Sequence, residues 1–173
     1  MVDAESMTPE RARAFATKIA FDRLAARDRS SAELRQALEK KQVPAEVITE
    51  VMGKLAAQGF VNDERFAFEW VAARHRSKGL ARTALSRELS QKGIAPELIQ
   101  LALESLDADD EKQRAHALIQ RKLPSVARFD TATQKRRLTS FLMRKGYPPH
   151  VCFDVVNQEL KASESFDEEL YFD

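Results

Sequence analysis

The stretch AARDRS at residues 25–30 recurs 47 positions later as AARHRS at residues 72–77. Upstream at the same offset, Ile19, Phe21 and Leu24 match Phe66, Phe68 and Val71. Beyond a four-residue insertion at 78–81 the match resumes at an offset of 51, pairing residues 34, 38, 41, 46, 48 and 55 with residues 85, 89, 92, 97, 99 and 106. A third, more divergent copy places residues 138, 142, 145 and 146 at 53 positions beyond 85, 89, 92 and 93. Such a repeat is typical of a tandem array of small structural units.

Each copy has the apolar periodicity of α-helices, and strand-like alternation is nowhere sustained. Apolar side chains at residues 66, 67, 70 and 71 form one stripe, and those at 34, 37 and 38 form another. Helix starts are predicted by capping boxes at residues 30–33 and 131–134 and by a cap at Asn62. Helix ends are predicted before Gly59, Gly93 and Gly146. Prolines suited to the start of a third helix stand at 44, 96 and 148–149.

We therefore predict an all-α fold in which three tandem three-helix repeats form an elongated, curved array. The predicted organisation is a lead segment at 1–13, repeats at 14–60, 61–107 and 108–160, and an acidic tail at 161–173. One three-helix unit of this size is marginal alone, so stacking on its neighbours is expected to bury the remaining apolar face.

The composition excludes several classes of protein. Among 173 residues, 43% are hydrophobic and 32% are charged, which indicates a folded chain rich in exposed helices. No stretch approaches the roughly 18 apolar residues of a membrane span, and the amino end lacks the layout of a secretory signal. We therefore expect a cytoplasmic protein with no membrane contact.

The chain offers poor material for a catalytic centre. It contains no Gly-rich phosphate loop, no HExxH motif and no nucleophile elbow. Cys152 is the single cysteine, and with His150 nearby it lacks the partners of a metal site, so we expect a half-buried thiol and a loop histidine. We expect Trp70 and the ten phenylalanines to be core residues rather than platforms for bases. The prediction is a non-enzymatic protein with no cofactor, no metal and no small-molecule substrate.

The charges are unevenly distributed although the formal net charge is only +1. Residues 112–145 carry ten basic side chains and one acidic one, whereas residues 146–173 carry one and seven. Arginine pairs are predicted to end the first helices of two copies, where cations suit the negative helix terminus. Their recurrence among other basic residues predicts a surface for an extended anion, either phosphates or the acidic face of a protein polymer. A solvated helix face is the alternative.

The candidate contact residues fall into two groups. The main group is Arg27, Arg29, Arg74, Arg76, Lys78, Arg82, Arg87 and Lys92. A secondary basic surface comprises Lys122, Arg128, Lys135, Arg136, Arg137, Arg144 and Lys145. We expect Phe66, Trp70, Leu85 and Leu89 to form the core that holds the central copy together.

Several motifs resemble the RecX family of bacterial regulatory proteins. The family's central repeat is resembled by NDERFA at 62–67, WV at 70–71, the arginines at 74 and 76, LSREL at 85–89 and QKGI at 91–94. The stretch LAARDRSSAEL at 24–34 resembles the first repeat, and the likeness extends over residues 15–160. The resemblance implies an all-helical protein that binds the RecA recombinase and mostly inhibits it. It also implies a position along the groove of the RecA filament on single-stranded DNA, lowered ATPase and strand-exchange activities, and, in some members, DNA binding.

The sequence also departs from the family pattern. Asn62 and Asp63 stand where many members carry two acidic residues, a change that keeps the helix cap. In the third copy the paired arginines become Arg121-Lys122-Leu123, so only general basicity is carried over. The tail after Leu160 lies outside the likeness, and we expect it to be disordered, with docking on a basic face as the alternative.

Two functions that would use a basic surface remain open, together with a third that would not use one. The leading one is a regulator of recombination and DNA repair that inhibits RecA filaments on single-stranded DNA. The alternative is a general nucleic-acid-binding helical module, which the basic stretch at 112–145 favours. A plain helical scaffold would need no basic surface at all.

Overall fold

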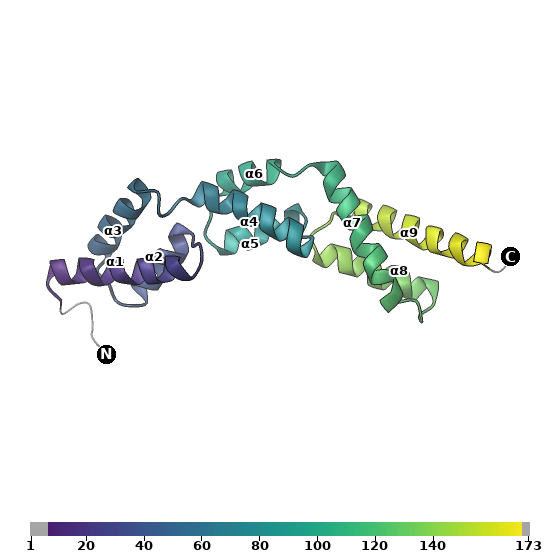
Figure 1. The fold of residues 1–173 in the computed structure, drawn as a ribbon, viewed down its shortest axis with the longest axis horizontal. Helices are drawn as coiled ribbons and strands as arrows, with labels where there is room; N and C mark the ends of the chain where they lie inside the picture. Colours follow the sequence, from purple (N-terminus) through teal and green to yellow (C-terminus); the bar gives the residue numbers. More distant parts are fainter. Residues whose placement is uncertain (1–6, 171–173) are drawn as a thin grey trace. The chain divides into compact units, whose positions relative to one another are not determined.

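The computed structural model of the chain describes residues 7–170, which form helices joined by short loops (Figure 1). In chain order they are α1 (Pro9–Ala26), α2 (Ser31–Glu39), α3 (Ala45–Ala57), α4 (Asp63–Lys78), α5 (Arg82–Gln91), α6 (Pro96–Glu104), α7 (Ala108–Lys122), the 3-10 helix η2 (Leu123–Ser125), α8 (Thr131–Arg144) and α9 (Pro149–Leu170). No strand occurs within residues 7–170. None of the described helices is long and apolar enough to cross a membrane. The predicted all-α fold is confirmed.

The chain divides into two compact units that do not coincide with the sequence repeats. Unit 1 comprises the chain up to Trp70 together with Glu88–Ala102, and unit 2 comprises Val71–Arg87 together with the chain from Leu103 onward. Helices α4, α5 and α6 therefore each contribute residues to both units.

In unit 1, small side chains allow α1 to lie close to its neighbours. Ala12, Ala16 and Ala20 recur every four residues on one face of α1 and are at most 1% exposed. This face packs against α2 and α3, whose buried leucines and valines complete the core. The core of unit 2 is built in the same way from α7, α8 and α9, with Ile119, Leu142 and Val155 fully buried.

Equivalent leucines of the three copies are buried in the structure. Leu34, Leu85 and Leu138 occupy one repeat position, and Leu38, Leu89 and Leu142 occupy the next position on the same helical face; all six are at most 1% exposed. The second helix of each copy thus presents the same apolar face inward, as the offsets of 51 and 53 residues predict.

Most of the predicted helix boundaries agree with the structure. Ser30 forms a complete capping box with Glu33, and the Asn62 side chain accepts a 2.9 Å bond from the Arg65 amide. The second predicted capping box is wrong, because Asp130 rather than Thr131 caps α8 by accepting from the Thr133 amide at 3.0 Å. Carboxylates are as effective as hydroxyls at this position. Gly59, Gly93 and Gly146 all have positive φ, as predicted for residues that close helices.

A hydrogen bond between second helices joins consecutive repeats inside each unit. In unit 1, the Ser30 hydroxyl donates a 2.6 Å bond to the carbonyl of Lys92, at the end of α5. In unit 2, the Ala81 amide donates a 2.8 Å bond to the carbonyl of Lys145, at the end of α8. Ser30 and Ala81 correspond in the structure, because each immediately precedes the second helix of its repeat. The start of the second helix in one repeat is therefore tied to the end of the second helix in the next.

A carboxylate from the following repeat supplies a second bond at the same junction. The Ser31 amide donates to Asp63 Oδ1 at 2.7 Å in unit 1, and the Arg82 amide donates to Glu111 Oε1 at 3.1 Å in unit 2. Both amides belong to first residues of helices, which have no partner within the helix, and both acceptors lie in the first turn of the next repeat's first helix. The acidic first turns thus serve the neighbouring helix as well as their own.

Three features differ from the sequence-based expectations. Residues beyond Leu160 continue α9 to Leu170 instead of being disordered, and 171–173 lie outside the described residues. Phe21, Phe60 and Phe153 are 39%, 48% and 45% exposed rather than buried. Trp70 is half-buried and Cys152 is fully buried.

Candidate anion-binding surfaces

A groove with only basic charged side chains lies in unit 2, where the last turn of α4 meets α7 and the end of α8. Its volume is about 400 Å³. The charged lining residues are Arg76, Lys78, Arg114, Arg121, Lys122 and Lys145, and no carboxylate is among the lining residues. We call this the α7 groove.

Helical spacing gathers these charges. Arg114 and Arg121 are seven residues apart on α7, so they lie on one face of that helix. Lys145 follows α8 and donates a 2.7 Å bond from Nζ to the Lys78 carbonyl, which holds its ammonium at the groove. Burial lowers the pKa of Lys145, and the nearby Lys78 ammonium lowers it further. A bound anion would relieve this repulsion.

Arg114 contributes a donor that is not used within the described chain. Its Nε is buried and has no hydrogen-bond partner among residues 7–170. A buried donor without an acceptor is costly, and most native structures avoid one. An anion in the α7 groove would be a suitable acceptor, because Arg114 lines that groove.

A second basic groove adjoins the first and shares Lys122 and Phe141 with it. This α8 groove has a volume of about 410 Å³, and its other charged lining residues are Arg136, Arg137 and Arg144. The Phe141 ring is half-buried, with the Nζ atoms of Lys122 and Lys145 at 5.8 and 5.6 Å from its centroid. The two grooves therefore form one continuous basic surface with an aromatic ring at their common edge.

A pocket in unit 1 occupies the corresponding place in the first repeat but has mixed charge. It is lined by Arg23, Arg29, Lys40 and Lys41 together with Glu33. Glu33, Gln36, Ala37 and Lys40 stand 104 residues before Arg137, Ser140, Phe141 and Arg144 of the α8 groove. The charged residues that line this cleft are thus all basic in the third copy, whereas those of the first copy include a carboxylate.

The surroundings of Arg29 in this pocket disfavour its positive charge. Its pKa is lowered by burial and then by the neighbouring Arg27 guanidinium. Its Nε, like that of Arg114, is buried without a hydrogen-bond partner in the described part of the chain.

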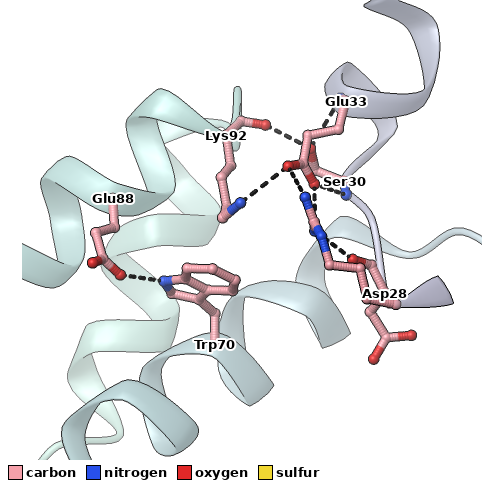
Figure 2. A network of polar contacts seen from close by, with 7 residues as sticks. Asp28, Ser30, Glu33, Trp70, Glu88 and Lys92 are labelled. Carbon is pink, nitrogen blue, oxygen red and sulfur yellow. Dashed lines mark hydrogen bonds and ion pairs between the residues drawn. The ribbon is translucent and has the colours of Figure 1, made fainter. Parts of the chain in front are cut away.

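Two of the predicted contact residues use their charges inside the protein instead (Figure 2). Arg27 and Lys92 donate to Glu33 Oε1 at 2.7 and 3.0 Å. Burial alone would raise the pKa of Glu33, but bonds from Arg27, Lys92 and the Ser30 amide outweigh it and hold the pKa at about 2. Arg27 is the C-cap residue of α1, in agreement with the prediction that it ends the first helix of its copy, whereas Arg29 lies beyond that helix.

Lys92 also covers the aromatic pair of the central repeat. Its Nζ lies 4.2 Å from the Trp70 ring centroid and 5.8 Å from that of Phe66. Trp70 donates from Nε1 to Glu88 at 2.8 Å, which explains why this side chain stops short of full burial. The cation over these rings is a structural contact within the second repeat, and the bond from the same ammonium group to Glu33 reaches the first repeat.

The remaining candidates are distributed differently. Arg82 donates from Nε to Glu111 at 2.9 Å and from its guanidinium to the Leu106 carbonyl. Arg74 is half-buried and interacts within the chain, whereas Arg76, Lys78 and Arg87 are exposed. Arg128 and Arg137 lie 4.9 and 3.9 Å from the Phe129 ring centroid. Lys135 is exposed and lines neither groove.

Sequence reasoning missed several residues of these surfaces. Arg114 and Phe141 in unit 2 and Arg23, Lys40 and Lys41 in unit 1 were not among the candidates. Lys40 and Lys41 could have been predicted from the repeat, because Lys41 is equivalent to the candidate Lys92 and Lys40 stands beside it. Nothing in the sequence marks Arg114 or Phe141, since their role depends on which helices meet.

Metal-binding and nucleophilic groups do not converge in the described chain. Among residues 7–170, no three His, Cys, Asp or Glu side chains are placed to hold a metal ion. The Cys152 thiol is buried, which raises its pKa, and His150 is exposed.

These features define a helical repeat protein with a basic surface formed by the end of α4 together with α7 and α8. Similarity to known sequences identifies the family. Three domain models match: "RecX, first three-helix domain" over residues 16–55, the second over 62–103 and the third over 109–156. The chain belongs to the RecX family.

Curated relatives named regulatory protein RecX match nearly the whole chain. The protein of Amycolatopsis mediterranei is 42% identical over 155 residues, covering 90% of this chain and 89% of its own length. That of Mycobacterium ulcerans is 39% identical over 160 residues, covering 92% and 90%. That of Streptomyces coelicolor is 38% identical over 152 residues, covering 88% and 79%.

Solved structures show the same fold at low sequence identity. The crystal structure of RecX from Lactobacillus salivarius superposes with a TM-score of 0.77 at 16% identity, covering 87% of this chain and 97% of that one. A second crystal structure of a regulatory protein RecX gives 0.77 at 19% identity, with coverage of 87% and 74%.

Proposed function

We propose that this protein binds the RecA filament on single-stranded DNA and inhibits its ATPase and strand-exchange activities, without being an enzyme itself. It would thereby modulate homologous recombination and DNA repair in the cytoplasm. The observation that carries this proposal is membership of the RecX family over all three repeats. Basic surfaces on a repeat protein add support, because weak contacts at successive repeats sum at high effective concentration.

The test is the DNA-dependent ATPase rate of cognate RecA, preassembled on single-stranded DNA, while this protein is titrated from well below one molecule per protomer. We expect the rate to fall at low ratios, because blocking growth at a filament end affects many protomers. Inhibition that reaches completion only at equal stoichiometry would refute end capping. No inhibition by protein of normal helicity would refute the proposed function.

The double variant R74A/R76A tests where the filament is bound. We expect weaker inhibition with unchanged helicity. A matched control is K18A/K54A, which removes two exposed lysines that pair with carboxylates four residues away. Equal inhibition by both variants would contradict the assignment.

A general nucleic-acid-binding module is the second candidate, favoured by the wholly basic lining charges of the α7 and α8 grooves. Salt dependence separates the two functions. Phosphate binding falls steeply with salt, by a slope that depends on the number of phosphates contacted, whereas a mixed protein interface responds less.

A further inference from the structure

We propose that the α7 and α8 grooves of unit 2 bind the sugar–phosphate backbone of single-stranded nucleic acid directly, with a base stacked on Phe141. This inference rests on the proposed function only for the source of the strand, which would be the DNA of the filament. The binding itself requires no RecA.

The charge of the lining favours a polyanion. Every charged residue lining the α7 groove is basic, and the same holds for the α8 groove. An acidic protein partner would also be attracted, but protein interfaces normally combine both signs of charge for specificity. Basic side chains without interspersed carboxylates are typical of surfaces that follow a phosphate backbone.

The α7 groove has hydrogen-bonding capacity that the described chain does not use. Arg114 Nε is buried without a partner in the described chain, and Arg114 lines the α7 groove. Lys145 is held there at a lowered pKa, by burial and by Lys78. Phosphate oxygens would both accept from the guanidinium and offset the repulsion between the ammonium groups.

The continuity of the two grooves favours an extended ligand. Because the two grooves share Lys122 and Phe141, one extended ligand can occupy both of them. A compact anion would neutralise one groove and leave the arginines of the other, Arg136, Arg137 and Arg144, without a counter-charge. A chain of phosphates meets both.

Phe141 favours a single strand over a duplex. Its half-buried ring packs against the core of unit 2 and also lines both grooves, with the ammonium groups of Lys122 and Lys145 within 6 Å of its centroid. Bases of a single strand can stack on such a ring while the phosphates contact the flanking cations. Paired bases of a duplex are already stacked and cannot use the ring without being displaced.

The corresponding pocket of the first repeat provides an internal comparison. At the place of Phe141 it has Ala37, and at the place of Arg137 it has Glu33, which is already neutralised by Arg27 and Lys92. That pocket lacks the aromatic ring and contains a carboxylate, so we assign the strand to the third repeat and not to the first.

The test uses the full chain without RecA and measures fluorescence anisotropy of labelled oligothymidylate. The groove variant is R76A/R121A/K122A, which removes three exposed charges. The charge-matched control is R23A/K40A/K41A in the pocket of unit 1. We expect the groove variant to bind oligothymidylate at least about tenfold more weakly. Because each phosphate contact of a single strand contributes about 0.7 to the steepness of the plot of log affinity against log salt, loss of three contacts should make that plot shallower by about 2. The control should stay within about twofold of the wild type.

The stacking contact needs its own variants. F141L keeps an apolar side chain but removes the ring, and F153L is the control at an exposed phenylalanine on α9. We expect F141L to lower the affinity for oligothymidylate about fivefold or more. Competition by inorganic tripolyphosphate should not change, because phosphate contacts remain. A duplex of equal length should bind more weakly than the single strand and be indifferent to F141L.

Several results would overturn the inference. These are no oligothymidylate binding by the folded wild type, equal loss in the groove and control variants, or binding unaffected by the groove variant. Loss of RecA filament binding with unchanged oligothymidylate binding would assign the grooves to protein instead. The RecA ATPase assay is independent: inhibition that survives alongside a failed oligonucleotide test refutes only this inference, whereas groove-dependent binding without inhibition refutes only the proposed function.

Discussion

The Ser30 hydroxyl donates a 2.6 Å hydrogen bond to the carbonyl of Lys92, 62 residues further along the chain. The same oxygen accepts from the Glu33 amide at 3.1 Å and so caps α2. Ser30 is fully buried, and one side chain thus starts a helix in the first repeat and joins it to the end of α5 in the second. The equivalent bond in unit 2, from the Ala81 amide to the Lys145 carbonyl, uses main chain alone.

Replacing this hydroxyl tests how much the junction contributes to stability. We expect Ser30→Ala to lower the free energy of unfolding by about 2–3 kcal/mol, from the lost cap and the unsatisfied carbonyl of Lys92. The measurement is the urea midpoint followed by circular dichroism. Ser31→Ala is the control, since only the backbone amide of Ser31 takes part in the junction. Equal midpoints for the two variants would show that the Ser30 bonds contribute little.

Close approach between repeats makes two glycines irreplaceable. A Cβ on Gly93 would lie 2.4 Å from Ala32 Cβ, and one on Gly146 would lie 2.4 Å from the Ala84 amide nitrogen. Gly59 has a similar positive φ but nothing within 4 Å, so it isolates the backbone cost. We expect Gly59→Ala to cost about 1–2 kcal/mol and each of the other two substitutions about 3 kcal/mol or more.

A compensating substitution distinguishes steric overlap from backbone strain at Gly93. Because its obstacle is the Ala32 side chain, Ala32→Gly should recover part of the stability lost in Gly93→Ala. Unfolding free energies of the two single variants and the double variant give the coupling. Simple additivity would contradict the overlap. No such rescue is available for Gly146, whose obstacle includes backbone.

The sequence predicted these glycines as helix ends but not as junctions. Periodicity, caps and the repeat offsets are local signals, so the helices and the buried leucines at 34, 85 and 138 could be predicted. What Lys92-Gly93 contacts depends on how consecutive repeats pack, which no local pattern encodes. Gln42 illustrates the difference: it has a φ of 56° at the position equivalent to Gly93, but it is exposed, and a side chain fits there.

The candidate site was predictable in its location and less so in its members. The excess of basic residues over 112–145 pointed to the region of the two grooves. Composition does not distinguish basic residues that pair with carboxylates inside the protein from those that line a groove, but burial and ion pairing in the structure do. Arg27 and Lys92 neutralise Glu33, whereas Arg114, absent from the candidates, lines a groove.

The Glu33 carboxylate should make the stability of unit 1 sensitive to acid. Its pKa in the folded protein is about 2, against 4.5 for the unperturbed group, because three bonds favour the ionised form despite burial. A lowered pKa stabilises the fold above pH 4.5, and the contribution is lost as the pH falls towards 2. At pH 7 it is on the order of 2–3 kcal/mol.

Glu33→Gln tests this linkage. The variant should be less stable than the wild type at pH 7, and the difference should shrink steadily between pH 5 and pH 2. The measurement is the free energy of unfolding by urea across that range. Glu50→Gln is the control, since Glu50 pairs with Arg13 and Lys54 in more exposed positions. A constant difference between wild type and Glu33→Gln would contradict the low pKa.

Arg82 and Arg87 lie on the same helix and were both predicted to face the filament, but their surroundings predict opposite behaviour. Arg82 pairs with Glu111 and bonds the Leu106 carbonyl, so Arg82→Ala should lower the unfolding free energy by about 1 kcal/mol. Arg87 is exposed, and Arg87→Ala should change it by less than about 0.5 kcal/mol. We expect Arg87→Ala to weaken RecA filament binding at unchanged urea midpoint. If instead Arg82→Ala weakens binding with full stability, its bond to Glu111 is dispensable and its charge belongs to the contact surface.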